Sequence, residues 1–147
     1  MAKEKVVAKY EQSLEIEGFI VKLKEKYPDV FGTVNPAEIR AYEIVNKPRP
    51  QSKAAEISIF GASGVFGVIS PVKYVLVAYS DDWVNWEENM QIINVAKAIK
   101  RISLDGNGKL NRFDEMNHKS FLLTFGLGYE DKEDIPNILN EEVKWVL

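Results

Sequence analysis

The spacing of apolar residues along the chain predicts two amphipathic helices. Between residues 13 and 27, apolar side chains recur every three or four positions, and the stretch "YPDVFG" then ends the helix. The expected buried face of this helix consists of Leu14, Phe19, Ile20 and Leu23. The same spacing predicts a second helix from about residue 85 to residue 102. Its expected buried face consists of Trp86, Met90, Ile93, Ala96 and Ile99.

Three segments between these helices are predicted to be β-strands. They are "AEIRAYEIV" at residues 37–45, "AAEISIF" at residues 54–60 and "KYVLVAYS" at residues 73–80. The third segment is almost entirely apolar around "VLV", which is typical of a central strand. We therefore expect residues 73–80 to form the central strand of a sheet.

The rest of the chain predicts a third helix and a tail. The helix spans residues 113–126 and is closed by a glycine, and the stretch "EDIPNILNEEVKWVL" adds a short helix or an edge strand. The order α-β-β-β-α-α predicts the α+β class, with helices packed on a small mixed or antiparallel sheet of three to four strands. We expect residues 1–147 to form a single domain, in which residues 1–12 and 130–147 are peripheral tails.

Composition narrows the classes of function. The 147-residue chain is 46% hydrophobic, and its formal net charge of -3 gives no general attraction to nucleic acid or to an anionic membrane. The chain contains no cysteine, which excludes disulfides, thiolate metal sites and a cysteine nucleophile. The charged start "MAKEKVVAKYEQ" is unlike a signal peptide, and no apolar run is long enough to cross a bilayer. We therefore expect a cytoplasmic protein without a membrane partner.

The stretch "SLDGNGKLNRFDE" at residues 103–115 resembles the calcium-binding loop of an EF-hand. Such a loop gathers oxygen ligands at alternate positions and closes with a bidentate glutamate at the twelfth. The residues of this candidate calcium loop are Ser103, Asp105, Asn107, Lys109, Asp114 and Glu115. Ser103 lacks the carboxylate of the first position, and Asp114 is shorter than the usual glutamate. The alternative is a tight polar turn, which uses Asp, Asn and Gly for their turn conformations.

Three longer stretches carry a second resemblance. They are "EIRAYEIVNKPRPQSKAAEISIFGASG", "KYVLVAYSDDWVNW" and "AIKRISLDGNGKLNRFDEMNHKSFLLTFG". Across residues 14–128 the chain resembles a family of phage and archaeal metallopeptidases with a zincin-like HExxH site. The positions that match the frame of the family in the third stretch are Ile102, Gly108, Lys109, Leu110, Asp114, Phe125 and Gly126. The resemblance implies a zincin-like fold for the single domain.

The residues that perform the chemistry of that family are replaced in this chain. "KAIKR" stands where HExxH would be, so that the resemblance places Lys97 and Arg101 at two ligand positions and Ala98 at the general base. Phe113 stands at the third ligand position. A zincin needs two neutral imidazoles one helical turn apart, a further ligand and a carboxylate that takes a proton from metal-bound water. Two cations on one helix face also repel a divalent ion.

Two hypotheses about function follow. The first is a non-catalytic, metallopeptidase-like protein of phage or mobile-element origin, which acts by binding an unknown protein partner without a cofactor. In that case Lys97 and Arg101 form the floor of a former active-site cleft, where they could bind a phosphate or a carboxylate. The simpler interpretation of the two cations is a solvated helix face. The second hypothesis is a calcium-binding or calcium-stabilised domain that uses residues 103–115.

Overall fold

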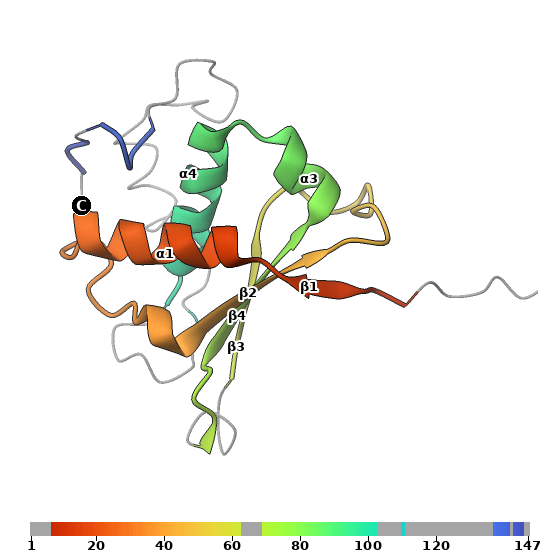
Figure 1. The fold of residues 1–147 in the computed structure, drawn as a ribbon, viewed down its shortest axis with the longest axis horizontal. Coiled ribbons are helices and arrows are strands. Elements are labelled where there is room, and N and C mark those ends of the chain that lie inside the picture. The colour runs from red at the N-terminus through yellow and green to blue at the C-terminus, as the bar shows by residue number, and fades with distance from the viewer. Residues whose placement is uncertain (1–6, 63–68, 103–109, 111–136, 142, 146–147) are drawn as a thin grey trace, which may run out of the picture.

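The computed structural model describes residues 7–62, 69–102, 110, 137–141 and 143–145. These residues form a four-stranded sheet with helices on one face (Figure 1). In chain order the elements are strand β1 (Tyr10–Gln12), helix α1 (Leu14–Lys26), the 3-10 helix η1 (Pro36–Glu38), strand β2 (Ile39–Ile44), strand β3 (Ser58–Gly61), strand β4 (Tyr74–Tyr79), helix α3 (Ser80–Asn85) and helix α4 (Glu88–Ile99). This arrangement confirms the predicted α+β class. The helix that we predicted at residues 113–126 lies outside the described residues.

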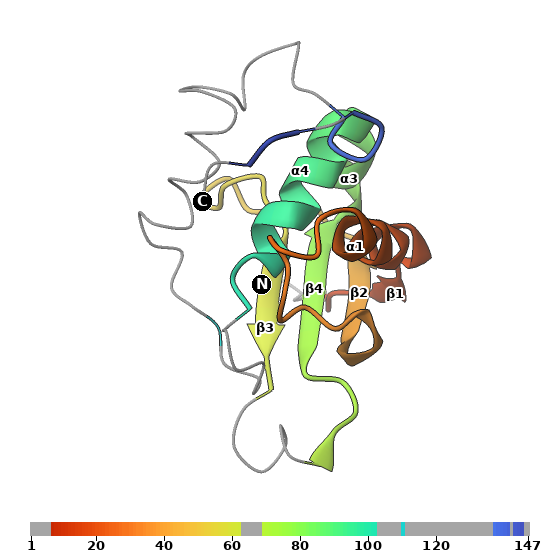
Figure 2. The ribbon, with the colours of Figure 1, turned by 90° about the vertical axis from the view of Figure 1, so that its left-hand side faces the viewer.

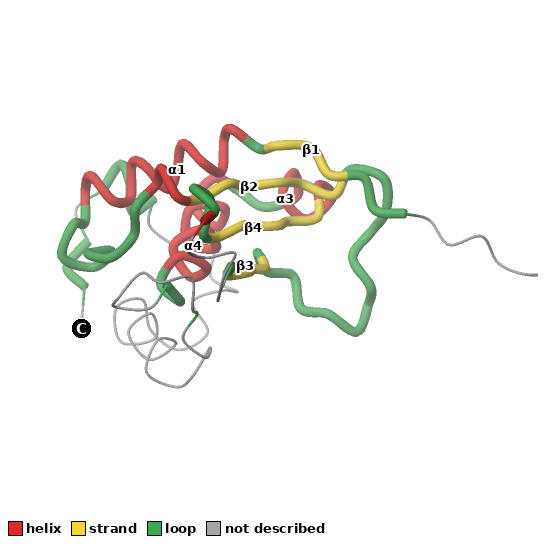
Figure 3. The backbone as a smooth tube through the Cα atoms, turned by 90° about the horizontal axis from the view of Figure 1, so that it is seen from below, coloured by secondary structure: helices red, strands yellow, loops and turns green. Residues whose placement is uncertain are grey.

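The sheet is mixed and has the strand order β1-β2-β4-β3 (Figure 3). β2 and β4 run parallel, with Ala41 opposite Leu76. β1 pairs antiparallel with β2, and β3 pairs antiparallel with β4. β4 therefore lies inside the sheet between β2 and β3, as its apolar sequence predicted. Among the described strands, β1 and β3 are the two edges.

α1 and α4 pack on the same face of the sheet (Figure 2). Side chains alternate along each strand, and those that point toward the helices are buried. The sheet contributes Ile39, Ala41, Ile59, Leu76 and Ala78 to this core, and the helices contribute residues that include Ile16, Ile20, Leu23, Ile92, Ile93 and Ile99. Because a close-packed core resists rearrangement, it fixes the position of α4 relative to β3.

The buried face of α1 begins two residues later than predicted. Ser13 caps the helix, because its hydroxyl accepts a hydrogen bond from the Ile16 amide at 3.3 Å. Ile16 points into the core, whereas Leu14, which we predicted to be buried, is 73% exposed. Two residues correspond to a rotation of about 200° around a helix, so Leu14 and Ile16 face in nearly opposite directions.

The single helix that we predicted for residues 85–102 is two helices. α3 follows β4 directly, and Trp86 and Glu87 then leave the helical conformation with ψ angles of 137° and 155°. The predicted boundary residue Asn85 therefore belongs to α3, and α4 begins at Glu88. The apolar period concealed this break because Trp86 packs against the same core as the helix that follows it.

Residues from both predicted tails take part in the sheet or the core. Gln12 of β1 lies opposite Tyr42 of β2. At the other end of the chain Ile138 is fully buried, and its carbonyl accepts a hydrogen bond from the Tyr27 hydroxyl at 2.6 Å. The Trp145 ring packs edge-on against Tyr27, with the ring centroids 5.8 Å apart. Both segments are too short for a clear period, which is why the apolar pattern did not reveal these contacts.

Candidate functional site

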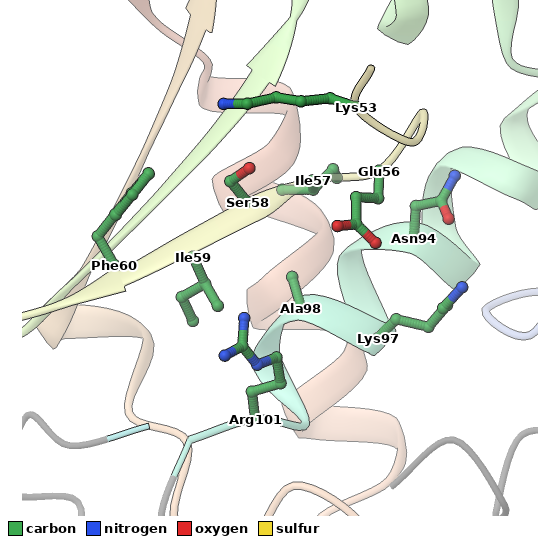
Figure 4. Close-up of a pocket in the computed structure, with 10 residues that line it drawn as sticks. All are labelled: Lys53, Glu56, Ile57, Ser58, Ile59, Phe60, Asn94, Lys97, Ala98 and Arg101. Atoms are coloured by element: carbon green, nitrogen blue, oxygen red, sulfur yellow. The ribbon is translucent and has the colours of Figure 1, made fainter. Parts of the chain in front are cut away.

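The main candidate site is a cleft between β3 and α4, which we call the β3–α4 cleft (Figure 4). Its volume is about 330 Å³. It is lined by β3 with the loop before it and by one face of α4 with the turn that follows: Lys53, Glu56, Ile57, Ser58, Ile59, Phe60, Asn94, Lys97, Ala98 and Arg101. The cleft therefore combines an apolar wall with several polar and charged groups, as binding sites for small ligands and peptides commonly do.

The cleft runs along the outer edge of β3. Ile59 lies opposite Leu76 of β4 and points toward the core, whereas Ser58 and Phe60 point to the other face of the sheet. A cavity beneath one face would be lined by only one of these sets, but the lining of the cleft includes both. Among the described residues, β3 pairs with β4 alone, so its other edge faces the cleft.

Lys97, Ala98 and Arg101, which the resemblance to metallopeptidases singled out, all line this cleft. Asn94, Lys97 and Ala98 are three or four positions apart and share one side of α4, and Arg101 follows in the turn after the helix. Ala98 is buried, and Lys97 and Arg101 are partly buried. In Figure 4 Arg101 extends toward Ile59, while Lys97 extends toward the end of the cleft that holds Asn94. Phe113, the fourth predicted position, lies outside the described residues.

Asn94 is a buried polar residue in this lining. The residue is only 6% exposed, and within the described part of the chain no group forms a hydrogen bond with its side-chain amide. Its amide oxygen and nitrogen are not among the described side-chain atoms that are enclosed without a partner, so the amide is accessible from the cleft. An asparagine amide offers one acceptor oxygen and two N–H donors, so Asn94 can serve a polar ligand in the cleft.

The loop before β3 supplies the polar groups on the opposite side of the cleft. Arg49 anchors this loop to α3, because its Nε lies 2.8 Å from the Asp82 carboxylate and its guanidinium also donates to the Lys53 carbonyl. We predicted a strand from residue 54, but the strand begins at Ser58. The preceding residues follow the anchored loop, and Glu56 points toward α4 in Figure 4.

The described residues of the cleft do not fit a catalytic zinc ion. Zinc in such sites is bound by imidazole, thiolate or carboxylate groups, and Lys97, Ala98 and Arg101 supply none of these. Among the described residues no three His, Cys, Asp or Glu side chains form a cluster that could hold a metal ion. Glu56 is the one carboxylate in the described lining, and no imidazole or thiolate accompanies it there.

Most of the candidate calcium loop lies outside the described residues. This applies to Ser103, Asp105, Asn107, Lys109, Asp114 and Glu115. Two described residues beside or within that segment, Ile102 and Leu110, form an isolated antiparallel β-bridge. The bridge does not test whether residues 103–115 bind an ion, and calcium binding stays a prediction.

The sequence analysis missed two residues that matter in the cleft. Asn94 interrupts the apolar stretch "IINVA", and a polar residue within the buried face of a helix is a signal that could have identified it. Glu56 carried no comparable signal, because we assigned it to a strand that in fact begins at Ser58. Only the folded chain shows that Glu56 and Asn94 line the same cleft.

Comparison of the chain with protein-family models, with curated proteins and with solved structures found no match. In the described part of the chain, no helix has the length and apolar character needed to span a lipid bilayer. The resemblance to metallopeptidases therefore stays a prediction, and the case for function depends on the geometry of the β3–α4 cleft.

Proposed function

We propose that this protein is a non-catalytic binding protein whose β3–α4 cleft receives an extended segment of a protein partner. The observation that carries the proposal is the position of the cleft along the outer edge of a sheet. An edge strand presents main-chain N–H and C=O groups that an added strand can pair with, while neighbouring pockets take alternate side chains. The ligand thus gains affinity from the backbone of β3 and selectivity from α4 and the loop.

The side chains around the cleft suit an extended peptide. Ile57, Ile59 and Phe60 offer apolar surface, and Phe60 is 58% exposed. Ser58 and the Asn94 amide offer hydrogen-bonding groups beside that surface. The cleft volume of about 330 Å³ is at the lower end for ligand pockets. The cleft therefore has room for one or two side chains of a longer peptide segment.

Two features support binding without hydrolysis. The resemblance to metallopeptidases places Lys97, Ala98 and Arg101 at the positions of two ligands and the general base, and none of these residues can perform those roles. Peptide hydrolysis also needs an activated water molecule or nucleophile, and the described lining contains neither a histidine nor a pair of carboxylates. The chain thus keeps a cleft of the kind that a peptidase would use and replaces its chemistry.

A selection with a random nonapeptide display library tests the proposal. We expect the full chain to enrich peptides whose binding is lost in Ala98→Met, because the longer side chain fills the cleft next to β3. Val84→Met is the matched control, since Val84 is an exposed residue of α3 outside the cleft lining, and it should leave binding unchanged. Peptides that bind Ala98→Met as well as the original chain would contradict the proposal.

The same peptides test the mode of binding and the absence of catalysis. In an added strand, every second main-chain N–H points toward β3 and the others point away from it. Methylation of the nitrogens in the first set should therefore abolish binding, and methylation of the second set should leave it intact. A selected peptide should also be recovered intact after incubation with the chain and zinc. Cleavage that is lost in Ala98→Met would show that the cleft is catalytic.

A further inference from the structure

We infer that the β3–α4 cleft selects an acidic segment, in which a side-chain carboxylate is bound by Arg101 and a main-chain peptide group by Asn94. This inference rests on the proposed function, because it names the chemistry of the partner that the same cleft would take. It is supported by two separate observations: the charges of the described cleft lining, and the Asn94 amide, which has no hydrogen-bond partner among the described residues.

Among the described residues that line the cleft, cations outnumber carboxylates, whereas the whole chain is slightly acidic. The chain has 19 Lys and Arg residues against 22 Asp and Glu residues, which gives the formal net charge of -3. The described lining of the cleft contains three cations, Lys53, Lys97 and Arg101, against one carboxylate, Glu56. A cationic cleft in an acidic protein attracts an anionic group and disfavours a basic one.

Arg101 is the residue best suited to hold the carboxylate. Its guanidinium extends from the turn after α4 toward Ile59 of β3 (Figure 4). A guanidinium binds a carboxylate through two parallel N–H···O bonds, and such charge-assisted pairs are stronger and more directional than neutral ones. Because an arginine has five N–H donors, a contact elsewhere in the protein does not use up its capacity.

The Asn94 amide favours a peptide over a small inorganic anion. It is 6% exposed, lines the cleft and has no hydrogen-bond partner among the described residues. The amide presents both a donor and an acceptor, which matches the C=O and N–H of a peptide group, whereas phosphate at neutral pH mainly accepts. Asn94 and Arg101 are seven residues apart, or about 10 Å along a helix, so one short peptide can contact both.

Glu56 allows a test in which a substitution is expected to strengthen the binding of an acidic peptide. Its carboxylate points across the cleft toward α4 in Figure 4, so a ligand carboxylate near Arg101 has one like charge beside it. Removing that charge while keeping the shape, as in Glu56→Gln, should strengthen the binding of an acidic peptide. Arg101→Gln should weaken it. A general loss of structure would weaken binding in both variants, so opposite signs identify an electrostatic cause.

The experiment compares synthetic peptides taken from the selection. Each peptide is acetylated and amidated, and each acidic residue is replaced in turn by Asn or Gln. We expect acidic residues to be enriched and one replacement to weaken binding roughly tenfold or more, as does Arg101→Gln, because a charge-assisted pair is lost. Glu56→Gln should tighten binding several-fold, and Lys22→Gln, at an exposed position on α1 outside the cleft, should have no effect.

The outcomes separate this inference from the proposed function. Peptides that bind in the cleft but are neutral, and whose affinity is the same for Arg101→Gln, would overturn the acidic inference and leave the binding function standing. Peptides that need a free C-terminal carboxylate would overturn the assignment to a side chain. If no selected peptide responds to Ala98→Met, the proposed function fails, and the acidic inference fails with it.

Discussion

The two edge strands of the described sheet differ in their side-chain surroundings. β1 is a three-residue strand whose residues are all exposed, and the charged side chains of Lys9 and Glu11 lie 3.9 Å apart beside it. Ile57, just before β3, and Ile59 within it are buried, and α4 lies across the cleft from the strand. Charges on a short strand are a usual means of preventing an edge from pairing with other chains. The comparison teaches that β1 is a protected edge and that β3 is the edge suited to a ligand.

The loops next to the two edges differ in the same way. The loop that leads into β3 is anchored to α3 by the ion pair of Arg49 and Asp82, and both side chains are largely buried. The exposed pair of Lys9 and Glu11 at β1 is long and solvated, and such pairs contribute little to stability. β3 is thus held in place together with the groups that line its cleft.

Truncation of one residue on each edge should give the largest difference. We expect Ile59→Ala to lower the free energy of unfolding by about 2–5 kcal/mol, because it leaves a cavity in the core. Tyr10→Ala, at a residue that is 55% exposed, should change it by no more than about 0.5 kcal/mol. Urea denaturation of both variants measures the two changes. Similar values would mean that the edges do not differ as described.

Loss of the loop anchor should have a smaller effect on stability and a clear effect on binding. We expect Arg49→Met to lower the free energy of unfolding by about 1–3 kcal/mol, because it leaves the Asp82 carboxylate without its partner. Peptide affinity should fall as well, since Lys53 and Glu56 lose their fixed positions. Lys9→Met breaks the ion pair at β1 and serves as the control. An unchanged peptide affinity in Arg49→Met would show that the anchor does not shape the cleft.

The pH dependence at the end of α4 should be smaller still. Burial lowers the pKa of Lys100, whose Nζ donates to the Val30 carbonyl at 3.1 Å. The unfolded chain therefore binds more protons than the folded chain between the lowered pKa and the ordinary value near 10.5, and stability rises with pH in that window. Comparison of denaturation midpoints for the original chain and Lys100→Met across alkaline pH should show this rise only in the original chain. If the denaturation midpoints of the two chains change equally with pH, Lys100 is not the cause of the rise.

Calcium is expected to have the least effect. If the protein acts through the β3–α4 cleft alone, its melting temperature should be the same with calcium, with zinc and with a chelator. A ligand that binds the folded state must raise its stability. A calcium-specific rise that is lost in Asp105→Ala would therefore show that residues 103–115 bind the ion, and that binding through the cleft is not the whole function.

The sequence predicted the parts of the fold that have strong apolar periods. The central position of β4 followed from its continuous apolar run, and the helical face from Ile93 to Ile99 followed from its spacing. The start of the buried face of α1 was missed, because the apolar pattern was read from Leu14, which is exposed, rather than from Ile16, which is buried. β1 was missed as well, because a short strand whose residues are all exposed has no alternation of burial.

The candidate site was less predictable, because it combines segments that are far apart in the chain. Lys97, Ala98 and Arg101 were selected from the sequence by resemblance, and the structure places all three in the lining of one cleft. Glu56 joins them only because β3 lies beside α4, which no local pattern encodes. Asn94 could have been found as the polar residue in an apolar helix face, but its lack of a partner among the described residues is a property of the folded chain.

Amide hydrogen exchange with a selected peptide bound distinguishes the two edges most directly. If β3 is the binding edge, exchange should slow at residues 58–61, where added main-chain hydrogen bonds protect amides, and should not change at residues 10–12. The same measurement on Ala98→Met should show no protection at either edge. Protection at residues 10–12, or bound peptide without protection at residues 58–61, would contradict strand addition at β3.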